Sequence, residues 1–140
     1  MTLRTGMTLI EVLAVVVILG LLAATLTVGL SGRIGKAKHE IARTQLAQIA
    51  GSVEAFRLDQ RRIPTSAEGL AALTSPADSA YFLEAGKLVD PWGKPYLYLV
   101  PGPDGQPFEV VTYGADGQPG GSGENGDLSS ANLSGAAKKP

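Results

Sequence analysis

The stretch that decides the fold is Met7–Leu30, with the sequence MTLIEVLAVVVILGLLAATLTVGL. Residues 12–30 carry no charge, and a helix over that run would be roughly 28 Å long at 1.5 Å per residue. This length approaches the roughly 30 Å hydrocarbon core of a bilayer. A helix packed on a soluble core would show a polar face, and this run has none. The pattern therefore predicts a membrane helix over residues 7–30.

Two kinds of membrane segment compete for this run. One is a secretory signal peptide with Arg4 as its positive charge and a cleavage site near Ala23–Thr25. The other is a retained membrane helix. The apolar run is longer than the roughly 7–15 residues that are typical of a signal peptide, so its length favours the retained helix.

Glu11 lies at the edge of the apolar run. An ionisable side chain inside lipid is expensive and marks a functional site by default. The alternative is that Glu11 lies in water at the headgroup level and that the span begins at Val12. The apolar run alone leaves both interpretations open.

The residues around Glu11 carry a motif. Gly6–Glu11, with the sequence GMTLIE, closely resembles the leader junction of type IV pilins and pseudopilins, although Met7 stands where that family usually has Phe. The resemblance implies that a prepilin peptidase removes residues 1–6, cutting between Gly6 and Met7, and methylates the new amino terminus.

The same resemblance implies a role for Glu11 in assembly. Its carboxylate would pair with the Met7 ammonium of a neighbouring subunit, and the Thr8 hydroxyl would supply a second contact. Such a pair would act chiefly to set the register between subunits, because desolvation offsets its Coulomb gain.

After Ser31 the composition becomes amphipathic. Apolar residues recur at helical spacing, which predicts one buried stripe of a helix: Ala42, Leu46, Ile49, Val53 and Phe56. Without a strong stop between the two patterns, we expect one long helix from about Thr8 to about Gln60. His39, between Lys38 and Glu40, is expected to be a solvated surface residue.

The second half of the chain predicts a small sheet. A short helix is expected after Ser66 as its N-cap, anchored by Leu70 and Leu73. Residues 96–100 and 108–112 have strand composition on either side of a turn, which predicts an antiparallel pair. The expected fold class is α+β, with the long helix packed on this sheet and covered by the Tyr96 and Tyr98 rings.

Composition excludes several function classes. The 140 residues carry a formal charge of -1, which offers no field to attract a nucleic acid. There is no Cys, so disulfides and Cys nucleophiles are excluded. The sequence shows no paired carboxylates and no nucleophile–base motif that would indicate an enzyme. We therefore expect a chain without catalytic activity.

A glycine-rich loop covers residues 114–127. Hard oxygen ligands in this loop favour calcium: Asp116, Glu124, Asn125 and Asp127. The alternatives are a flexible linker and a phosphate cradle, but the cradle would need a Lys-Ser/Thr pair that the loop lacks.

The body of the chain is similar to the major pseudopilin family of type II secretion, to about Leu128. The similarity rests on Phe56–Asp59, Ile63–Thr65, Asp90–Tyr96 and Gly114–Gly117. It implies a type IV pilin-like fold with a C-terminal calcium loop. The ligands would be Asp116, Asn125, Asp127 and a carbonyl near Thr112. Asn125 stands where the closest subgroup tends to have Asp.

The resemblance implies a structural subunit. Residues 7–30 would form the transmembrane and assembly helix in the bacterial inner membrane, residues 31–128 a periplasmic domain, and residues 129–140 a flexible tail. The subunit would polymerise with itself, with minor pseudopilins and on an inner-membrane assembly platform, into a pseudopilus that drives export of folded proteins across the outer membrane. One alternative is a type IV pilus subunit for adhesion, motility or DNA uptake. Another is a soluble calcium-binding module released by signal peptidase.

Overall fold

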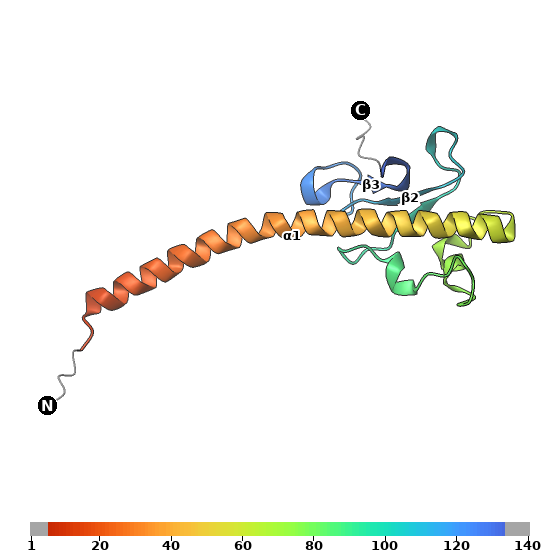
Figure 1. Cartoon of the computed structure of the whole chain (residues 1–140). Coiled ribbons are helices and arrows are strands. Elements are labelled where there is room, and N and C mark those ends of the chain that lie inside the picture. The colour runs from red at the N-terminus through yellow and green to blue at the C-terminus, as the bar shows by residue number, and fades with distance from the viewer. Residues whose placement is uncertain (1–5, 134–140) are drawn as a thin grey trace. The chain divides into compact units, whose positions relative to one another are not determined.

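The computed structural model describes residues 6–133, and within them the side chains of residues 26–31 lie outside the description. The chain divides into two units, Met1–Gly35 and Lys36–Pro140. Helix α1 (Leu9–Gln60) begins in the first unit and ends in the second (Figure 1). The predicted helix over residues 8–60 is confirmed. Arg4 and most of the predicted leader lie outside the described residues.

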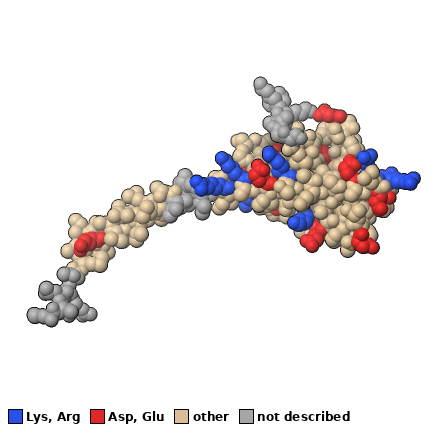
Figure 2. Space-filling view, viewed as in Figure 1, with Lys and Arg blue, Asp and Glu red and all other residues tan. Residues whose placement is uncertain are grey.

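The first unit exposes its apolar side chains. Between Leu9 and Leu22 the large apolar side chains are 45% to 88% exposed. Glu11 is the one charged residue between positions 7 and 32. In the view of Figure 2, most charged side chains gather on the second unit. Among the residues whose side chains are described, no helix combines the length and the apolar character needed to cross a membrane.

The second unit holds a three-stranded antiparallel sheet in the order β1-β2-β3. Strand β1 (Leu97–Leu99) pairs with β2 (Glu109–Thr112), and β2 pairs with β3 (Leu128–Ser129). Both predicted strands are therefore confirmed in pairing and direction. β3 was not predicted, because two residues are too short to show a periodic pattern.

Five short 3-10 helices connect these elements within the described part of the chain. They are η1 (Gly69–Thr74), η2 (Ala85–Leu88), η3 (Pro103–Gly105), η4 (Gly123–Asn125) and η5 (Ser130–Asn132). η1 is the short helix predicted after Ser66, and both expected anchors, Leu70 and Leu73, are buried.

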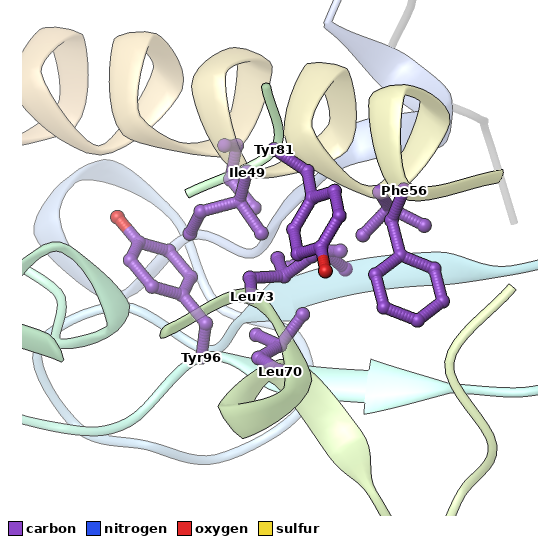
Figure 3. Packing of buried hydrophobic residues seen from close by; sticks show 9 residues of the cluster. Ile49, Phe56, Leu70, Leu73, Tyr81 and Tyr96 are labelled. Atoms are coloured by element: carbon purple, nitrogen blue, oxygen red, sulfur yellow. The ribbon is translucent and has the colours of Figure 1, made fainter. Parts of the chain in front are cut away.

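The core forms between the stripe of α1 and the sheet. All five predicted stripe residues are at most 4% exposed. Figure 3 shows Ile49 and Phe56 of α1 with Leu70, Leu73, Tyr81 and Tyr96 of the covering segments. Each fully buried Leu, Ile or Val stabilises the fold by roughly 1.5–3 kcal/mol. This packing, rather than helix propensity, holds the second half of α1 in place.

The two predicted tyrosines join the core to the helix. The Tyr96 hydroxyl donates to Gln45 Oε1 at 2.7 Å, and the Tyr98 hydroxyl donates to the Pro64 carbonyl at 3.0 Å. Burial raises the pKa of Tyr98 to about 12 and the pKa of Tyr96 further still. Both phenols therefore stay neutral donors at any physiological pH.

Two expectations about single residues were wrong. Thr65, rather than Ser66, caps the segment before η1, because its hydroxyl accepts from the Glu68 amide. His39 is half-buried and not a fully solvated residue, since its Nε2 is buried and its ring lies edge-on to Trp92 with the centroids 5.3 Å apart. The helical pattern around His39 could not reveal a ring that arrives from residue 92.

The expected flexible tail is wrong for residues 129–133. Ser129 lies in β3, and the Ser130 hydroxyl accepts from the Val110 amide at 2.9 Å. Leu133 packs against the core. Residues 134–140, the remainder of the predicted tail, lie outside the described residues.

Candidate functional sites

The N-terminal site is built by Thr8 and Glu11 at the start of α1. Glu11 Oε2 accepts from the Thr8 amide at 2.8 Å and from the Thr8 hydroxyl at 2.9 Å. The Thr8 hydroxyl in turn accepts from the Glu11 amide at 3.4 Å. This reciprocal arrangement is a capping box, which satisfies two backbone donors at the helix start. The Thr-x-x-Glu spacing is its signal in the sequence, and the pilin resemblance did not use it.

The capping box leaves half of the Glu11 carboxylate open. Among the described residues, Oε1 has no partner, because the side-chain hydrogen bonds of Glu11 use Oε2. Gly6 and Met7 precede the helix as exposed residues, with Met7 69% exposed. The predicted cleavage bond therefore lies between two exposed residues. In the described part of the chain, Glu11 Oε1 remains available to accept from a cation.

A second Thr-x-x-Glu box has the same local geometry and a different surrounding. Glu68 Oε2 accepts from the Thr65 amide at 2.8 Å and the Thr65 hydroxyl at 2.9 Å. Arg62 donates to both carboxylate oxygens, at 2.7 and 2.9 Å. The Arg62 hydrogen bonds, followed by those from Thr65, lower the pKa of Glu68 to about 2. The guanidinium also lies 5.2 Å from the Phe56 ring centroid, where a cation–π contact is favourable.

The two aspartates of the candidate calcium loop each accept a hydrogen bond from a backbone amide of the loop. Asp116 Oδ1 accepts from the Gln118 amide at 3.0 Å, and Asp127 Oδ2 accepts from the Gly120 amide at 2.8 Å. Within the described residues, the other oxygen of each carboxylate has no partner. Both side chains are exposed, as is Asn125. Each aspartate therefore shapes the loop with one oxygen and keeps the other available for a ligand.

Glycine brings backbone carbonyls into the interior of this loop. Gly114 has a φ of +64°, and a Cβ there would lie 2.6 Å from the Glu124 carbonyl oxygen and 3.0 Å from the Gly126 oxygen. Gly121 has a φ of +89°, and a Cβ there would lie 2.6 Å from the Asn125 carbonyl oxygen. Any side chain at these two positions would push the carbonyls away.

Thr112 occupies a different place from the other predicted ligands. It is 2% exposed in β2, and its hydroxyl donates to Asp90 Oδ2 at 2.6 Å. The same hydroxyl accepts from the Gly114 amide at 3.3 Å. Its hydroxyl is therefore used in contacts with Asp90 and with Gly114 at the start of the loop. Of its oxygens, this leaves the backbone carbonyl as a possible ligand.

The donor set of the loop fits calcium, provided that the backbone takes part. Between residues 6 and 133, no three Asp, Glu, His or Cys side chains gather as a metal-holding group. Calcium takes six to eight oxygen ligands and accepts carbonyls as well as carboxylates. The open oxygens of Asp116 and Asp127, the Asn125 amide and the loop carbonyls are all ligands of this kind.

Sequence reasoning missed the residues that attach the loop to the body. Asp90 is a buried carboxylate, 5% exposed, whose Oδ1 accepts from the Trp92 and Lys94 amides. Lys94 Nζ donates to the Ala115 carbonyl at 2.8 Å. The 90–94 segment entered the sequence analysis only through its resemblance to pseudopilins, because nothing in its local pattern indicates a contact with residue 115.

Comparison of the sequence with known proteins identifies relatives along most of its length. The family model described as Type II secretion system (T2SS), protein G matches residues 29–131. Type II secretion system core protein G of Vibrio cholerae is 40% identical over 138 residues, covering 93% of both chains. The protein of the same name from Pseudomonas aeruginosa is 38% identical over 107 residues, covering 71% of this chain and 75% of that one.

A solved structure has the same fold. It is the major pseudopilin from the type 2 secretion system of enterohaemorrhagic Escherichia coli, with a TM-score of 0.55 and 26% sequence identity. The similarity covers 75% of this chain and 94% of that one. The packing of a helix on a small antiparallel sheet, expected from the sequence, is thus shared with this structure.

Proposed function

This chain belongs to the family of type II secretion system protein G, and we propose that, as a major pseudopilin, it polymerises into a periplasmic pseudopilus that drives export of folded proteins. The observation that carries the proposal is the contrast within α1. One half is packed in a core, whereas the other exposes an uncharged apolar surface that begins at a half-satisfied carboxylate. Exposed apolar surface of that extent is typical of a segment that meets lipid or partner helices.

Deletion of the gene tests this function. Without the chain, we expect exported proteins to accumulate in the periplasm and pseudopilus fibres to disappear, and expression of the wild-type chain should restore both. Unchanged export together with loss of surface pili, motility or DNA uptake would instead support the type IV pilus alternative, which the comparisons do not favour.

Leader processing is part of the proposal. A prepilin peptidase would cut between Gly6 and Met7 and methylate the Met7 amine, since both residues are exposed ahead of α1. Mass spectrometry of the mature chain should find methylated Met7 at its amino terminus. A mature start near Thr25 would contradict the proposal and favour cleavage by a signal peptidase.

The open Glu11 oxygen suggests how subunits recognise one another. The Met7 ammonium of a neighbouring copy would donate to Oε1, while Thr8 keeps Oε2 in place. Arg62 makes the equivalent contact to Glu68 within one chain. The capping box would therefore aim Glu11 before assembly, so that the pair sets the register between adjacent helices.

The proposal includes a location and partners for the chain. We place residues 7–30 in the inner membrane as a single span and the second unit in the periplasm. The proposed partners are other copies of the chain, the minor pseudopilins and the inner-membrane assembly platform, with prepilin peptidase acting before assembly. The role is structural, and no catalytic step is assigned to any residue.

Calcium is the proposed ligand of the loop at residues 114–127. Asp116, Asn125 and Asp127 would hold it together with backbone carbonyls, and Thr112 would contribute only through its carbonyl. Calcium would neutralise the Asp116 and Asp127 charges and fasten a loop that has no disulfide. Because a ligand that binds only the folded state stabilises it, saturating calcium should raise the melting temperature of the full chain.

Chelation gives the matching measurement. Melting of the full-length chain in detergent should occur at a lower temperature in EGTA than in calcium, and Asp127→Asn should reduce the difference. Magnesium serves as the control cation, because its small octahedral shell suits this ligand set less well. Equal melting temperatures in calcium and EGTA would dismiss the calcium site.

A further inference from the structure

The turn at residues 90–94 contacts the glycine-rich loop at two points. On one side, Asp90 Oδ2 accepts from Thr112, whose hydroxyl accepts from the Gly114 amide. On the other side, Lys94 Nζ donates to the Ala115 carbonyl at 2.8 Å. Asp90 links the two contacts, because its Oδ1 accepts from the Lys94 amide at 2.8 Å.

The Lys94 side chain lies against a glycine of the loop. A Cβ at Gly117 would be 2.5 Å from Lys94 Nζ and 3.1 Å from Cε. Gly117 also has a φ of +70°, which residues with a side chain rarely adopt. The backbone at position 117 thus permits a close approach of the ammonium that any other residue would obstruct.

Charge favours a cation at this place. The loop contains Asp116, Glu124 and Asp127, and no Lys or Arg. Lys94 is partly buried between turn and loop, and a charged donor in such a place makes a stronger hydrogen bond than a neutral one. Its contact with Ala115 lies next to Asp116, one of the proposed calcium ligands.

The two halves of the loop are held differently. Contacts to the 90–94 turn and to Thr112 reach residues 114–117. Residues 120–127 are held by bonds inside the loop, from Gly120 to Asp127, from Asn125 to Ser122 and from Gly126 to Gly123. The Ala115 amide also donates to the Glu124 carbonyl at 2.8 Å and joins the two halves. Within the described residues, Lys94 contacts the first half of the loop directly and the second half only through Ala115.

We infer that Lys94 is a positioning residue whose ammonium fastens residues 114–118 without metal, so that calcium has only residues 120–127 left to order. The part about calcium rests on the proposed calcium site, whereas the role of Lys94 does not. The chain would thus keep the start of its loop in place when calcium is scarce, and would present Asp116 already positioned when calcium returns.

Hydrogen exchange followed by mass spectrometry tests the inference on the full-length chain in detergent, in EGTA and in calcium. In EGTA, Lys94→Met should speed exchange in residues 114–118 by at least about tenfold, as expected for loss of a hydrogen bond to a charged group. Lys94→Arg should restore most of the protection, because a guanidinium can donate to the same carbonyl. Calcium should return the Met variant towards the wild-type rate.

Matched controls separate this role from a general loss of stability. Lys87→Met removes the same charge from η2 and should leave loop exchange unchanged. Residues 42–56 of α1 serve as an internal reference and should exchange as in the wild type.

Three results would overturn the inference: wild-type loop exchange in the Lys94→Met variant in EGTA, an equal effect of Lys87→Met, or a matching loss of protection in the reference helix. If the wild-type loop exchanges alike in calcium and EGTA, the calcium site is contradicted. The role of Lys94 is still decided by the EGTA samples.

Discussion

Thr8–Glu11 and Thr65–Glu68 are two copies of one local structure in different surroundings. The amide contacts of the two threonines to their glutamates are both 2.8 Å, and the hydroxyl contacts are both 2.9 Å. Among the described residues, only the second glutamate has a cation, Arg62, on its other oxygen. The same four-residue spacing therefore builds a capping box in both units. In the described residues, the carboxylate is paired with a cation only in the second unit.

The two boxes have the same local hydrogen bonds, so the difference between them lies in the residues that surround each glutamate. Glu68 joins the end of α1 to η1, over a core that includes Phe56 and Leu70. Glu11 begins a helical segment whose large apolar side chains are exposed. The Thr65–Glu68 box contributes to the stability of one chain, and the Thr8–Glu11 box is suited to the proposed contacts between chains.

The largest expected effect is on assembly. Glu11→Ala should leave the chain inserted in the membrane and abolish fibres, because the amine of the neighbouring subunit loses its acceptor. Electron microscopy of fibres, together with membrane fractionation, measures both outcomes. Glu68→Ala is the matched control and should still assemble. Normal fibres from Glu11→Ala would remove the distinction between the two boxes.

The next effect is on the core, which the described residues form in the second unit. Leu73 is fully buried, and Leu73→Ala should lower the free energy of unfolding by about 2–5 kcal/mol. Leu13→Ala, at a position that is 64% exposed, should leave it unchanged in detergent. Denaturant unfolding of the full-length chain measures both. A similar loss from Leu13→Ala would indicate that the first unit also packs within one chain.

The smallest effect is the pH dependence of the stability that the Glu68 carboxylate contributes. The pKa of Glu68 is about 2 in the folded chain, below its ordinary value of 4.5. The ionised carboxylate thus stabilises the folded chain above pH 4.5, and this contribution is lost as the pH falls from 4.5 towards 2. Glu68→Gln should lower the melting temperature at neutral pH, by a margin that shrinks over this range. Asp78→Asn, at an exposed carboxylate, is the control, and a margin that stays constant down to pH 2 would contradict the paired carboxylate.

Local patterns predicted a large part of the fold. The stripe from Ala42 to Phe56 identified the buried face of α1, since helical spacing is a property of neighbouring residues. The alternation around Tyr96 and Tyr98 identified the strand pair for the same reason. The motif from Gly6 to Glu11 located the N-terminal site, although its capping box was missed.

Contacts between distant segments could not be predicted in this way. β3 has only two residues, and the Trp92 ring that covers His39 comes from a turn more than fifty positions away. Lys94 has an ordinary polar neighbourhood in the sequence, and its partner Ala115 offers only a backbone carbonyl. A carbonyl carries no signature of its residue type, so neither member of such a contact can be recognised in advance.

The sequence by itself determined the long helix, its apolar and amphipathic halves, the strand pair and the likeness to pseudopilins, because each follows from the order of neighbouring residues. Tertiary structure alone decided which Thr-x-x-Glu box receives an arginine, which end of the loop is anchored by Lys94, and that residues 129–133 join the sheet and core. These outcomes depend on which backbone and side-chain groups meet in space, and the folded core brings them together.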